Sequence, residues 1–387
     1  MKVNFQDTTV AFSLKSDSEL ERAYFLFKMI QSEPMVRIGT AVTNFALKTH
    51  LPVESLIRAS VFDHFCGGTT AEDAIPVIER MYAKSVHSVL DYSVEGKEDE
   101  VQFDKALVMG EKLIQFAKEK ETIPFTVFKP TGFGRLALYE KVTNKETLTT
   151  AEAQEWQNVV DRYEKICKLS YENDIPVLID AEESWMQGAA DDLIEEMMRK
   201  YNKEKVIVFG TLQLYRWDRL DYLKSLYERA QEQGFYIGMK LVRGAYMEKE
   251  RERAEDKGYP SPICKDKEAT DKNYDDTLRF MMDNDRMAVF AGTHNEESSQ
   301  LLVDLASQKD ISKTDSRMWF GQLYGMSDHI SFNLAAAGYN VTKYLPFGPV
   351  RDVMPYLIRR AEENTSVSGQ TSRELSLLKQ ERKRRKV

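Results

Sequence analysis

Short apolar and β-branched segments alternate with longer amphipathic segments along the chain after residue 85. The amphipathic segments, for example 152–172, 189–201 and 217–232, carry apolar residues at helical spacing. Alternating strands and helices indicate parallel pairing, because two parallel strands need a long crossover between them. The segments expected to form strands are 86–91, 123–129, 175–180, 206–213, 236–243, 287–294, 318–323 and 341–347.

This repeating pattern between residues 86 and 347 predicts an α/β fold, a distorted (β/α)8 barrel of the TIM type with an N-terminal helical arm. Barrels of this kind typically take roughly 250 residues, which agrees with the span of the pattern. A doubly wound parallel sheet is the alternative architecture, although such a sheet usually has fewer strands.

The segments on either side of the predicted barrel have a different pattern. Residues 16–84 are expected to be helical, and Ser18-x-x-Glu21 has the spacing of a capping box. A last helix is predicted over 349–363, and the end of the chain from Glu381 to Lys386 is strongly basic. We expect this end to be disordered and solvated, with contact to an anionic membrane surface as the alternative. The expected domains are an arm (1–84), a barrel (85–365) and a polar, basic tail (366–387).

Composition and charge exclude several classes of function. The formal net charge of −8 argues against a nucleic-acid partner, because phosphate binding needs a broad basic surface. The three cysteines and five histidines are scattered, so no disulfide framework, zinc site or other metal site is expected. The N-terminus resembles neither a signal peptide nor a transit peptide, and no apolar run approaches the ~18 residues of a membrane span. These features predict a cytoplasmic protein in a reducing compartment, peripheral to a membrane at most.

Most of the predicted strands end in hydrogen-bonding or ionisable side chains. In a barrel the carboxyl ends of all strands meet at one face, where active sites are built. Strand ends that simply leave the core into solvent are the alternative, and for any single residue that alternative is stronger. It is weaker for the whole set, because the set contains acids, bases, amides and a phenol. These residues are Asp91, Lys129, Asp180, Gln213, Lys240, Arg243, Thr293, His294, Gln322 and Tyr344.

Several of these residues have more than one interpretation from local sequence. Lys129 is a candidate Schiff-base nucleophile, a partner for a carboxylate or a solvated strand end. Asp180 is a candidate base, a metal ligand or a helix N-cap, and capping is the commonest role for such a residue. His294 is a candidate phosphate ligand or a donor to a loop carbonyl.

The pair Arg359-Arg360 lies on the last predicted helix of the barrel. Two guanidinium groups can hold one carboxylate strongly through charge-assisted hydrogen bonds. The alternative is a surface arginine paired with Glu362 or Glu363 at helical spacing, which local sequence alone favours.

One apparent nucleotide motif does not predict a nucleotide site. Residues Gly132-Phe-Gly-Arg-Leu-Ala137 follow a predicted strand and match the dinucleotide pattern. That pattern requires an acid at the end of the next strand about 20 residues further on. The next strand here ends at Asp180, more than twice that distance away, so a Rossmann-type NAD site is rejected.

The ordered motifs at the later strand ends resemble those of the proline dehydrogenase family. The resemblance covers roughly residues 85–370, and order, spacing and strand placement all agree. The motifs are Lys240-Leu-Val-Arg-Gly-Ala-Tyr246, Thr293-His-Asn295, Gln322-Leu-Tyr-Gly-Met326, Tyr344-Leu-Pro-Phe-Gly348 and Tyr356-Leu-Ile-Arg-Arg-Ala-Glu-Glu-Asn364.

The resemblance implies an enzyme that binds FAD and oxidises L-proline to Δ1-pyrroline-5-carboxylate, passing electrons to a membrane quinone. It assigns Asp180 and Lys240 as catalytic residues. The implied substrate-binding residues are Lys129, Tyr246, Leu323, Tyr344, Arg359 and Arg360. The implied cofactor-binding residues are Ala181, Gln213, Lys240, Arg243, Gly244, Ala245, Lys267, Thr293 and His294. The chain is too short for the fused aldehyde dehydrogenase of bifunctional relatives, so a separate pyrroline-5-carboxylate dehydrogenase is expected downstream.

Two features, an exchanged pair of residues and a tyrosine, refine what the resemblance implies. Many bacterial members have Arg first and Lys fourth in the motif that here is Lys240-Leu-Val-Arg243, and this order resembles the eukaryotic, mitochondrial branch. The exchange puts the detailed hydrogen bond to flavin N5 in doubt. Tyr344 leaves little room for a ring hydroxyl, and hydroxyproline-oxidising relatives tend to have a smaller residue there, so proline is the expected substrate.

Three other functions remain open. A Schiff-base aldolase or lyase on the same barrel would use Lys129 or Lys240 as its nucleophile. A hydroxyproline-oxidising flavoenzyme is a closer alternative. A non-catalytic protein would bind a carboxylate or an amino acid through Arg359 and Arg360 without any turnover.

Overall fold

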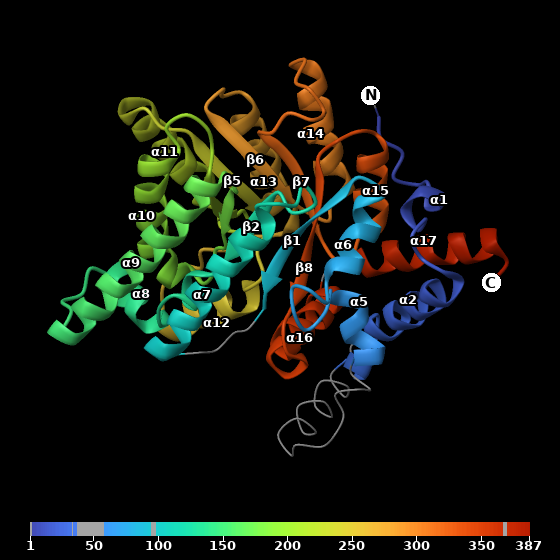
Figure 1. Cartoon of the computed structure of the whole chain (residues 1–387), viewed down its shortest axis with the longest axis horizontal. Coiled ribbons are helices and arrows are strands. Elements are labelled where there is room, and N and C mark those ends of the chain that lie inside the picture. Colours follow the sequence, from blue (N-terminus) through green and yellow to red (C-terminus); the bar gives the residue numbers. More distant parts are fainter. Residues whose placement is uncertain (1, 33, 37–57, 94–97, 367–369) are drawn as a thin grey trace. The chain divides into compact units, whose positions relative to one another are not determined.

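The computed structural model describes residues 2–32, 34–36, 58–93, 98–366 and 370–387. Its eight strands form a closed barrel in chain order from β1 to β8 (Figure 1). This confirms the predicted fold class and excludes the doubly wound sheet, which has open edges. The strands are β1 (Val86–Tyr92), β2 (Phe125–Phe128), β3 (Val177–Ile179), β4 (Val208–Gln213), β5 (Ile237–Val242), β6 (Met287–Gly292), β7 (Met318–Leu323) and β8 (Val341–Phe347).

Helices connect the strands as the amphipathic segments predict. Among the described residues before β1, the helices are α1 (Thr8–Ala11), α2 (Asp17–Ile30), the π-helical turn η1 (Arg58–Phe62), α5 (Asp63–Phe65) and α6 (Ile75–Tyr82). Those between β1 and β5 are α7 (Glu100–Ala117), η2 (Pro130–Gly132), α8 (Leu136–Thr143), α9 (Thr150–Asn173), α10 (Ser184–Tyr201) and α11 (Arg219–Gln233). The later ones are α12 (Met247–Lys257), α13 (Lys267–Met282), α14 (Glu296–Gln308), α15 (Asp328–Ala336), α16 (Val350–Ser366) and α17 (Gln370–Arg385).

The chain forms two compact units, here called unit 1 (Gly96–Phe320) and unit 2 (Lys2–Glu95 with Gly321–Val387). In unit 1, strands β2 to β6 pair in parallel, each with the next. Phe125 on β2 makes edge-to-face contacts with the rings of Phe209 and Phe290, at centroid distances of 5.6 and 5.4 Å. Such contacts add to the burial of large rings, so aromatic side chains from separate strands make up this core.

In unit 2, β1 and β8 pair in parallel along their full length, from Val86 with Val341 to Tyr92 with Phe347. A second core lies around α16, where Phe62, Val353 and Leu357 are almost fully buried. Unit 2 therefore joins the N-terminal helices to strands from both ends of the barrel sequence.

Two expectations for the chain ends are wrong. Helix α2 is capped by Ser16 and Glu19, and not by Ser18 and Glu21. The Ser16 side chain accepts from the Glu19 backbone N–H, and the Glu19 side chain accepts from the Ser16 backbone N–H. Both serine–glutamate pairs have the capping spacing, but α2 begins at Asp17, so Ser18 already lies inside the helix and Ser16 takes the N-cap position.

The expected disorder of the C-terminal tail is also wrong, because residues Gln370–Arg385 form α17. Leu375, Leu377 and Leu378 are buried against Phe12 and Leu20 of the N-terminal helices. Figure 1 shows α17 beside α2, in agreement with their contacts. Three leucines within four residues are too few to predict a helix by themselves, because the stability of the helix comes from a partner distant in sequence.

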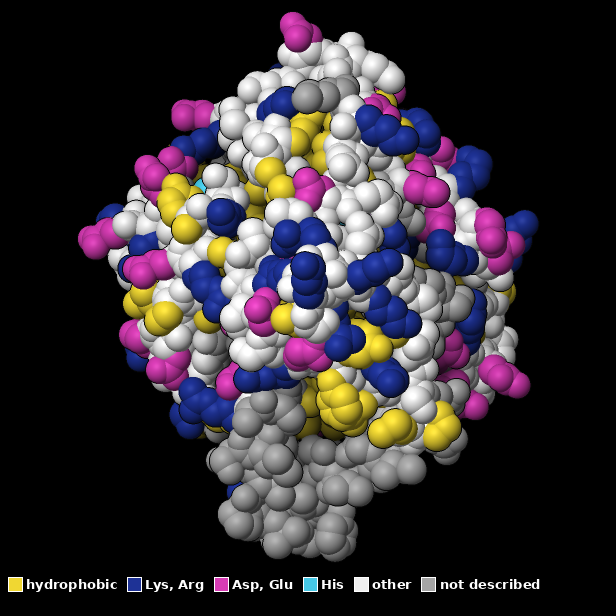
Figure 2. Space-filling view, turned by 90° about the vertical axis from the view of Figure 1, so that its right-hand side faces the viewer, with side chains coloured by type: hydrophobic (Ala, Val, Ile, Leu, Met, Phe, Trp, Pro, Cys, Tyr) yellow, Lys and Arg dark blue, Asp and Glu magenta, His cyan; other side chains and the backbone are white. Residues whose placement is uncertain are grey.

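The charges of α17 are divided between ion pairs and the surface. Arg382 pairs with Glu21, and Arg385 donates to the backbone oxygens of Phe12 and Lys15 at 2.8 and 2.7 Å. Lys and Arg side chains gather over the face of the molecule that Figure 2 shows. Within the described ranges, no helix is long and apolar enough to cross a membrane. Contact of the tail with lipid and the predicted domain boundaries stay predictions.

Replacing Leu378 by alanine tests the docking of α17. The side chain is fully buried among apolar neighbours, so we expect a loss of about 2–4 kcal/mol in the free energy of unfolding. Urea unfolding measures this loss, and Ser376→Ala on the exposed side of α17 is the matched control. Equal, small effects of the two substitutions would contradict the docking.

Candidate active site

A half-buried carboxylate between two lysines lies at the strand ends of unit 1. Asp180 follows β3 and is hydrogen-bonded through Oδ1 to the ammonium group of Lys240 on β5. Its other oxygen, Oδ2, lies 4.0 Å from Nζ of Lys129, which follows β2. All three side chains are at most 17% exposed, so their charges interact more strongly than they would in water. The capping interpretation of Asp180 is excluded, because Glu183 occupies the N-cap position of α10.

Gln213 at the end of β4 carries an acceptor that the described residues do not satisfy. Its Nε2 donates to the backbone oxygen of Ala181 at 3.4 Å, whereas its buried Oε1 has no hydrogen-bond partner. A buried amide oxygen without a donor is costly unless a bound molecule supplies one. The N–H groups of a flavin ring system are suitable donors, so this position fits the expected cofactor.

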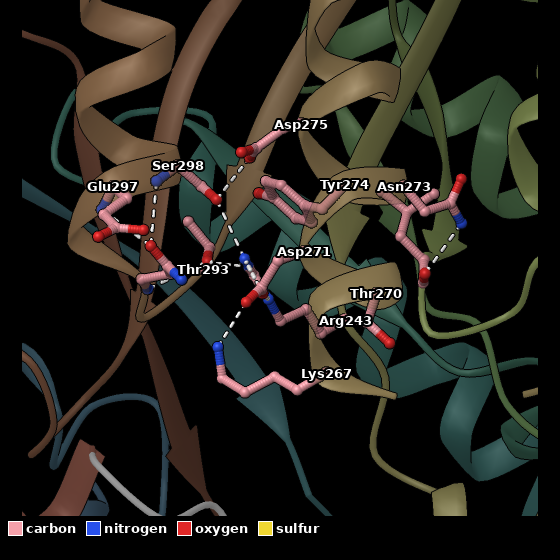
Figure 3. A network of polar contacts seen from close by, with 12 residues as sticks. Arg243, Lys267, Thr270, Asp271, Asn273, Tyr274, Asp275, Thr293, Glu297 and Ser298 are labelled. Carbon is pink, nitrogen blue, oxygen red and sulfur yellow. Dashed lines mark hydrogen bonds and ion pairs between the residues drawn. The ribbon is translucent and has the colours of Figure 1, made fainter. Parts of the chain in front are cut away.

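Arg243, directly after β5, lies at the centre of the polar network in Figure 3. Its guanidinium group donates to Asp271 at 2.7 Å, to the Thr293 hydroxyl at 2.8 Å and to the Ser298 hydroxyl at 3.0 Å. Lys267 pairs with the same Asp271 from one turn earlier on α13. The structure thus brings together Arg243, Thr293 and Lys267, which sequence analysis assigned to the cofactor.

Gly244 has a structural reason to be glycine, whatever the loop binds. Its φ angle is +123°, and a Cβ atom there would lie 2.2 Å from the ring of Tyr215. A larger residue would strain the backbone and clash with that ring. Ala245 beside it is exposed, and Tyr246 is half-buried at the start of α12.

The loop after β6 places His294 beside a capping residue. Asn295 accepts hydrogen bonds from the backbone N–H groups of Glu297 and Ser298 at 2.8 and 3.0 Å and so begins α14. His294 is half-buried. A phosphate-binding role for His294 stays a prediction.

Unit 2 holds the remaining predicted substrate residues. Tyr344 on β8 is 7% exposed, and Leu323 is the last residue of β7. Arg359 and Arg360 on α16 are half-buried, and the Arg360 guanidinium lies 5.2 Å from the ring centroid of Tyr356. The side chains of residues 362 and 363 lie outside the described residues, so the surface-pair interpretation is not tested. A shared role of these arginines with Lys129 stays a prediction.

Glu182 is a buried residue of this region that sequence analysis missed. Its carboxylate accepts hydrogen bonds from the backbone N–H and the hydroxyl of Thr131, at 2.8 and 2.7 Å. Burial raises the pKa of Glu182 to about 7, although the two bonds from Thr131 act in the opposite direction. Glu182 thereby holds the segment after Lys129 against the segment after Asp180. The three acids among the four residues that follow a buried strand were the signal that could have identified it.

Comparison with known proteins identifies the family. A family model described as proline dehydrogenase matches residues 74–373. The chain belongs to the proline dehydrogenase family. It is therefore an enzyme of the oxidoreductase class, and the matched residues contain every predicted site residue.

Proline dehydrogenases and related proteins from several organisms resemble most or all of the chain. It is 31% identical over 433 residues to proline dehydrogenase 1, mitochondrial, from Arabidopsis thaliana, covering 100% of this chain and 87% of that protein. It is 36% identical over 335 residues to the carbapenem antibiotics biosynthesis protein CarD of Pectobacterium carotovorum, covering 86% of this chain and 85% of that protein. It is 30% identical over 421 residues to hydroxyproline dehydrogenase of Xenopus laevis, covering 99% of this chain and 90% of that protein.

Solved structures support the fold. Proline utilization A from Bdellovibrio bacteriovorus, inactivated by N-propargylglycine, superimposes with a TM-score of 0.72 at 21% identity. The match covers 97% of this chain but only 38% of that much longer chain. Since several family members are named mitochondrial, the cytoplasmic location stays a prediction.

The raised pKa of Glu182 predicts a pH-dependent stability. Between about pH 4.5 and pH 7 the folded state keeps the Glu182 proton that the unfolded state has lost, so its contribution to stability decreases as pH rises. We expect wild type to lose up to about 3 kcal/mol relative to Glu182→Gln across this window. Urea unfolding of both proteins at pH 5 and pH 8 measures the difference. A difference between the two proteins that does not change with pH would contradict the raised pKa.

Proposed function

We propose that the chain oxidises L-proline to Δ1-pyrroline-5-carboxylate with FAD as its cofactor and a quinone as the final electron acceptor. The observation that carries the proposal is the cluster of Lys129, Asp180, Lys240 and Gln213 at the strand ends of unit 1. The cluster lies within the residues that match the proline dehydrogenase family. This reaction would be the first step of proline breakdown, and a separate dehydrogenase would consume the product.

The flavin is assigned to the loops of unit 1. When bound, it supplies a two-electron acceptor for the hydride that leaves the carbon next to the proline ring nitrogen. The residues proposed to hold it are Ala181, Gln213, Lys240, Arg243, Gly244, Ala245, Lys267, Thr293 and His294. Lys240 contributes a positive charge to this region, and its bond to Asp180 fixes the direction of that charge.

The carboxylate of proline needs cationic partners that hold the ring in one orientation. Arg359 and Arg360 supply planar donors that suit a carboxylate, with Lys129 as a further cation. Hydride transfer requires the reacting carbon within near-attack distance, so a fixed ring orientation contributes directly to the rate. The ring nitrogen must lose its proton as the hydride leaves, which favours activity above neutral pH.

Tyr344, Tyr246 and Leu323 are proposed to line the pocket around the proline ring. A buried tyrosine at position 344 limits the space for a ring hydroxyl. Hydroxyproline is the second candidate substrate, and the 30% identity to a hydroxyproline dehydrogenase supports testing it. A Schiff-base lyase with Lys240 as its nucleophile is less well supported, because Lys240 Nζ is hydrogen-bonded to Asp180.

The visible absorption spectrum of the purified protein tests this proposal. We expect flavin bands that are bleached by anaerobic L-proline, because the substrate reduces the cofactor. If only trans-4-hydroxy-L-proline bleaches the flavin bands, the substrate is hydroxyproline and not proline. A colourless protein that cannot be reconstituted with FAD would overturn the proposal, and trapping with borohydride would then test the lyase.

The replacement of Arg359 by methionine tests the carboxylate-binding role. Loss of a charge-assisted hydrogen bond is expected to lower kcat/KM for proline by roughly 10- to 100-fold, with an unchanged flavin content. Steady-state kinetics and the flavin-to-protein absorbance ratio measure the two effects. Arg351→Met, an exposed position on the same helix, is the matched control. Wild-type kinetics in the Arg359 variant would remove this residue from the proposed site.

A further inference from the structure

A fully buried lysine holds the turn that follows β7 in unit 2. Lys343 on β8 has 0% exposure, and its ammonium group pairs with Asp328 Oδ1 at 2.8 Å. It also donates to the backbone oxygens of Leu323, at 3.4 Å, and Met326. One side chain thus binds both ends of the turn and the first residue of α15.

Lys343 and Tyr344 are consecutive residues of the same strand. Successive side chains of a strand point to opposite faces, so the ammonium group and the phenol lie on opposite sides of β8. A backbone hydrogen bond also connects the turn to β8, because the Tyr324 N–H donates to the Tyr344 backbone oxygen at 2.8 Å. The position of Leu323 relative to Tyr344 therefore depends on the contacts behind the strand.

The rest of the turn is held by residues distant in sequence. The His64 ring nitrogen Nε2 lies 3.0 Å from the Gly325 oxygen, and Glu374 of α17 accepts from the Ser327 N–H at 3.1 Å. Gly325 has a φ angle of +79°, and a Cβ atom there would lie 2.3 Å from the His64 oxygen. The turn has little room to move on this side.

Charge balance makes Lys343 hard to replace within this cluster. Asp328 is also paired with Lys15, 3.0 Å away. Burial acts to raise the pKa of Asp328, but the charges of Lys15 and Lys343 hold it well below its usual range. A buried ion pair gives little net stability, whereas removal of one partner leaves the other charge uncompensated.

We propose that Lys343 is a positioning residue that sets substrate specificity by fixing Leu323 relative to Tyr344. This inference rests on the proposed function, in which both residues line the pocket for the proline ring. The lysine touches neither substrate nor cofactor and acts through the turn. A pocket held at a fixed width accepts an unsubstituted five-membered ring and rejects the same ring with a hydroxyl group.

The test compares Lys343→Met with wild type on two substrates, L-proline and trans-4-hydroxy-L-proline. We expect kcat/KM for L-proline, divided by kcat/KM for trans-4-hydroxy-L-proline, to fall by roughly 10- to 100-fold. The reason is that displaced pocket residues no longer discriminate between the two rings. KM for proline should rise while the flavin content stays at the wild-type level. A role in folding alone would lower the amount of active enzyme and leave both KM and the ratio unchanged.

Arg162→Met in unit 1 is the matched control for loss of a buried cation. Arg162 is 5% exposed, pairs with Glu100 and Asp104, and donates to the Phe133 oxygen at 3.0 Å. We expect this variant to lose stability but to keep the wild-type substrate ratio. If Lys343→Met does not fold, the double variant Lys343→Met with Asp328→Asn removes both charges and should show the same fall in the ratio.

The outcomes separate this inference from the proposed function. If proline reduces the wild-type enzyme and the Lys343 variants keep the wild-type ratio, the positioning role is wrong and the proposed function stands. A fall in the ratio equal to that of Arg162→Met would also overturn it. If proline does not reduce the wild-type enzyme, both proposals are overturned together.

Discussion

The parallel pairing of β1 with β8 is the constraint on which the rest of the fold depends. It joins residues 86–92 to residues 341–347. The first strand of the sequence therefore finds the hydrogen-bonding partner for one of its edges only in the last strand. No local interaction can compensate for an unpaired strand edge, because each backbone N–H and C=O group buried there needs a partner. The helices at both chain ends belong to the same compact unit as this pair and form an apolar core of their own.

One carboxylate in each unit lies between two lysines. Asp180 lies between Lys129 and Lys240 in unit 1, and Asp328 lies between Lys15 and Lys343 in unit 2. Each carboxylate has two cationic neighbours from other segments, which offsets the cost of removing its charge from water. The first group lies among residues proposed to act on substrate and cofactor, and the second lies behind residues proposed to shape the pocket. The need to neutralise a carboxylate inside the protein is thus met at the proposed reaction site by the lysines around Asp180. Behind the proposed pocket it is met by the lysines around Asp328.

Much of the fold could be predicted from the sequence, because the barrel repeats a simple pattern. Seven of the eight strands lie within their predicted segments, and β1 extends one residue beyond its segment, to Tyr92. Apolar runs of this length between amphipathic helices have few other ways to bury their surface. The candidate site residues at the ends of β3 and β5 could be selected for the same reason: a polar residue that ends an apolar strand is visible in the sequence. Glu182 and Lys343 could not be assigned, because their roles depend on Thr131 and on the Leu323 carbonyl, partners that no spacing rule connects to them.

The sequence by itself determined the barrel, its strand segments and the order of the motifs that place this chain in the proline dehydrogenase family. Only the tertiary structure decided that Asp180 forms ion pairs instead of capping a helix, that the basic tail is the helix α17, and that Ser16 begins α2. The physical reason is the range of the interactions. Periodicity records which face of a segment is apolar, whereas the partner of a buried charge or of a short leucine run comes from a distant part of the chain and appears only when the chain is folded.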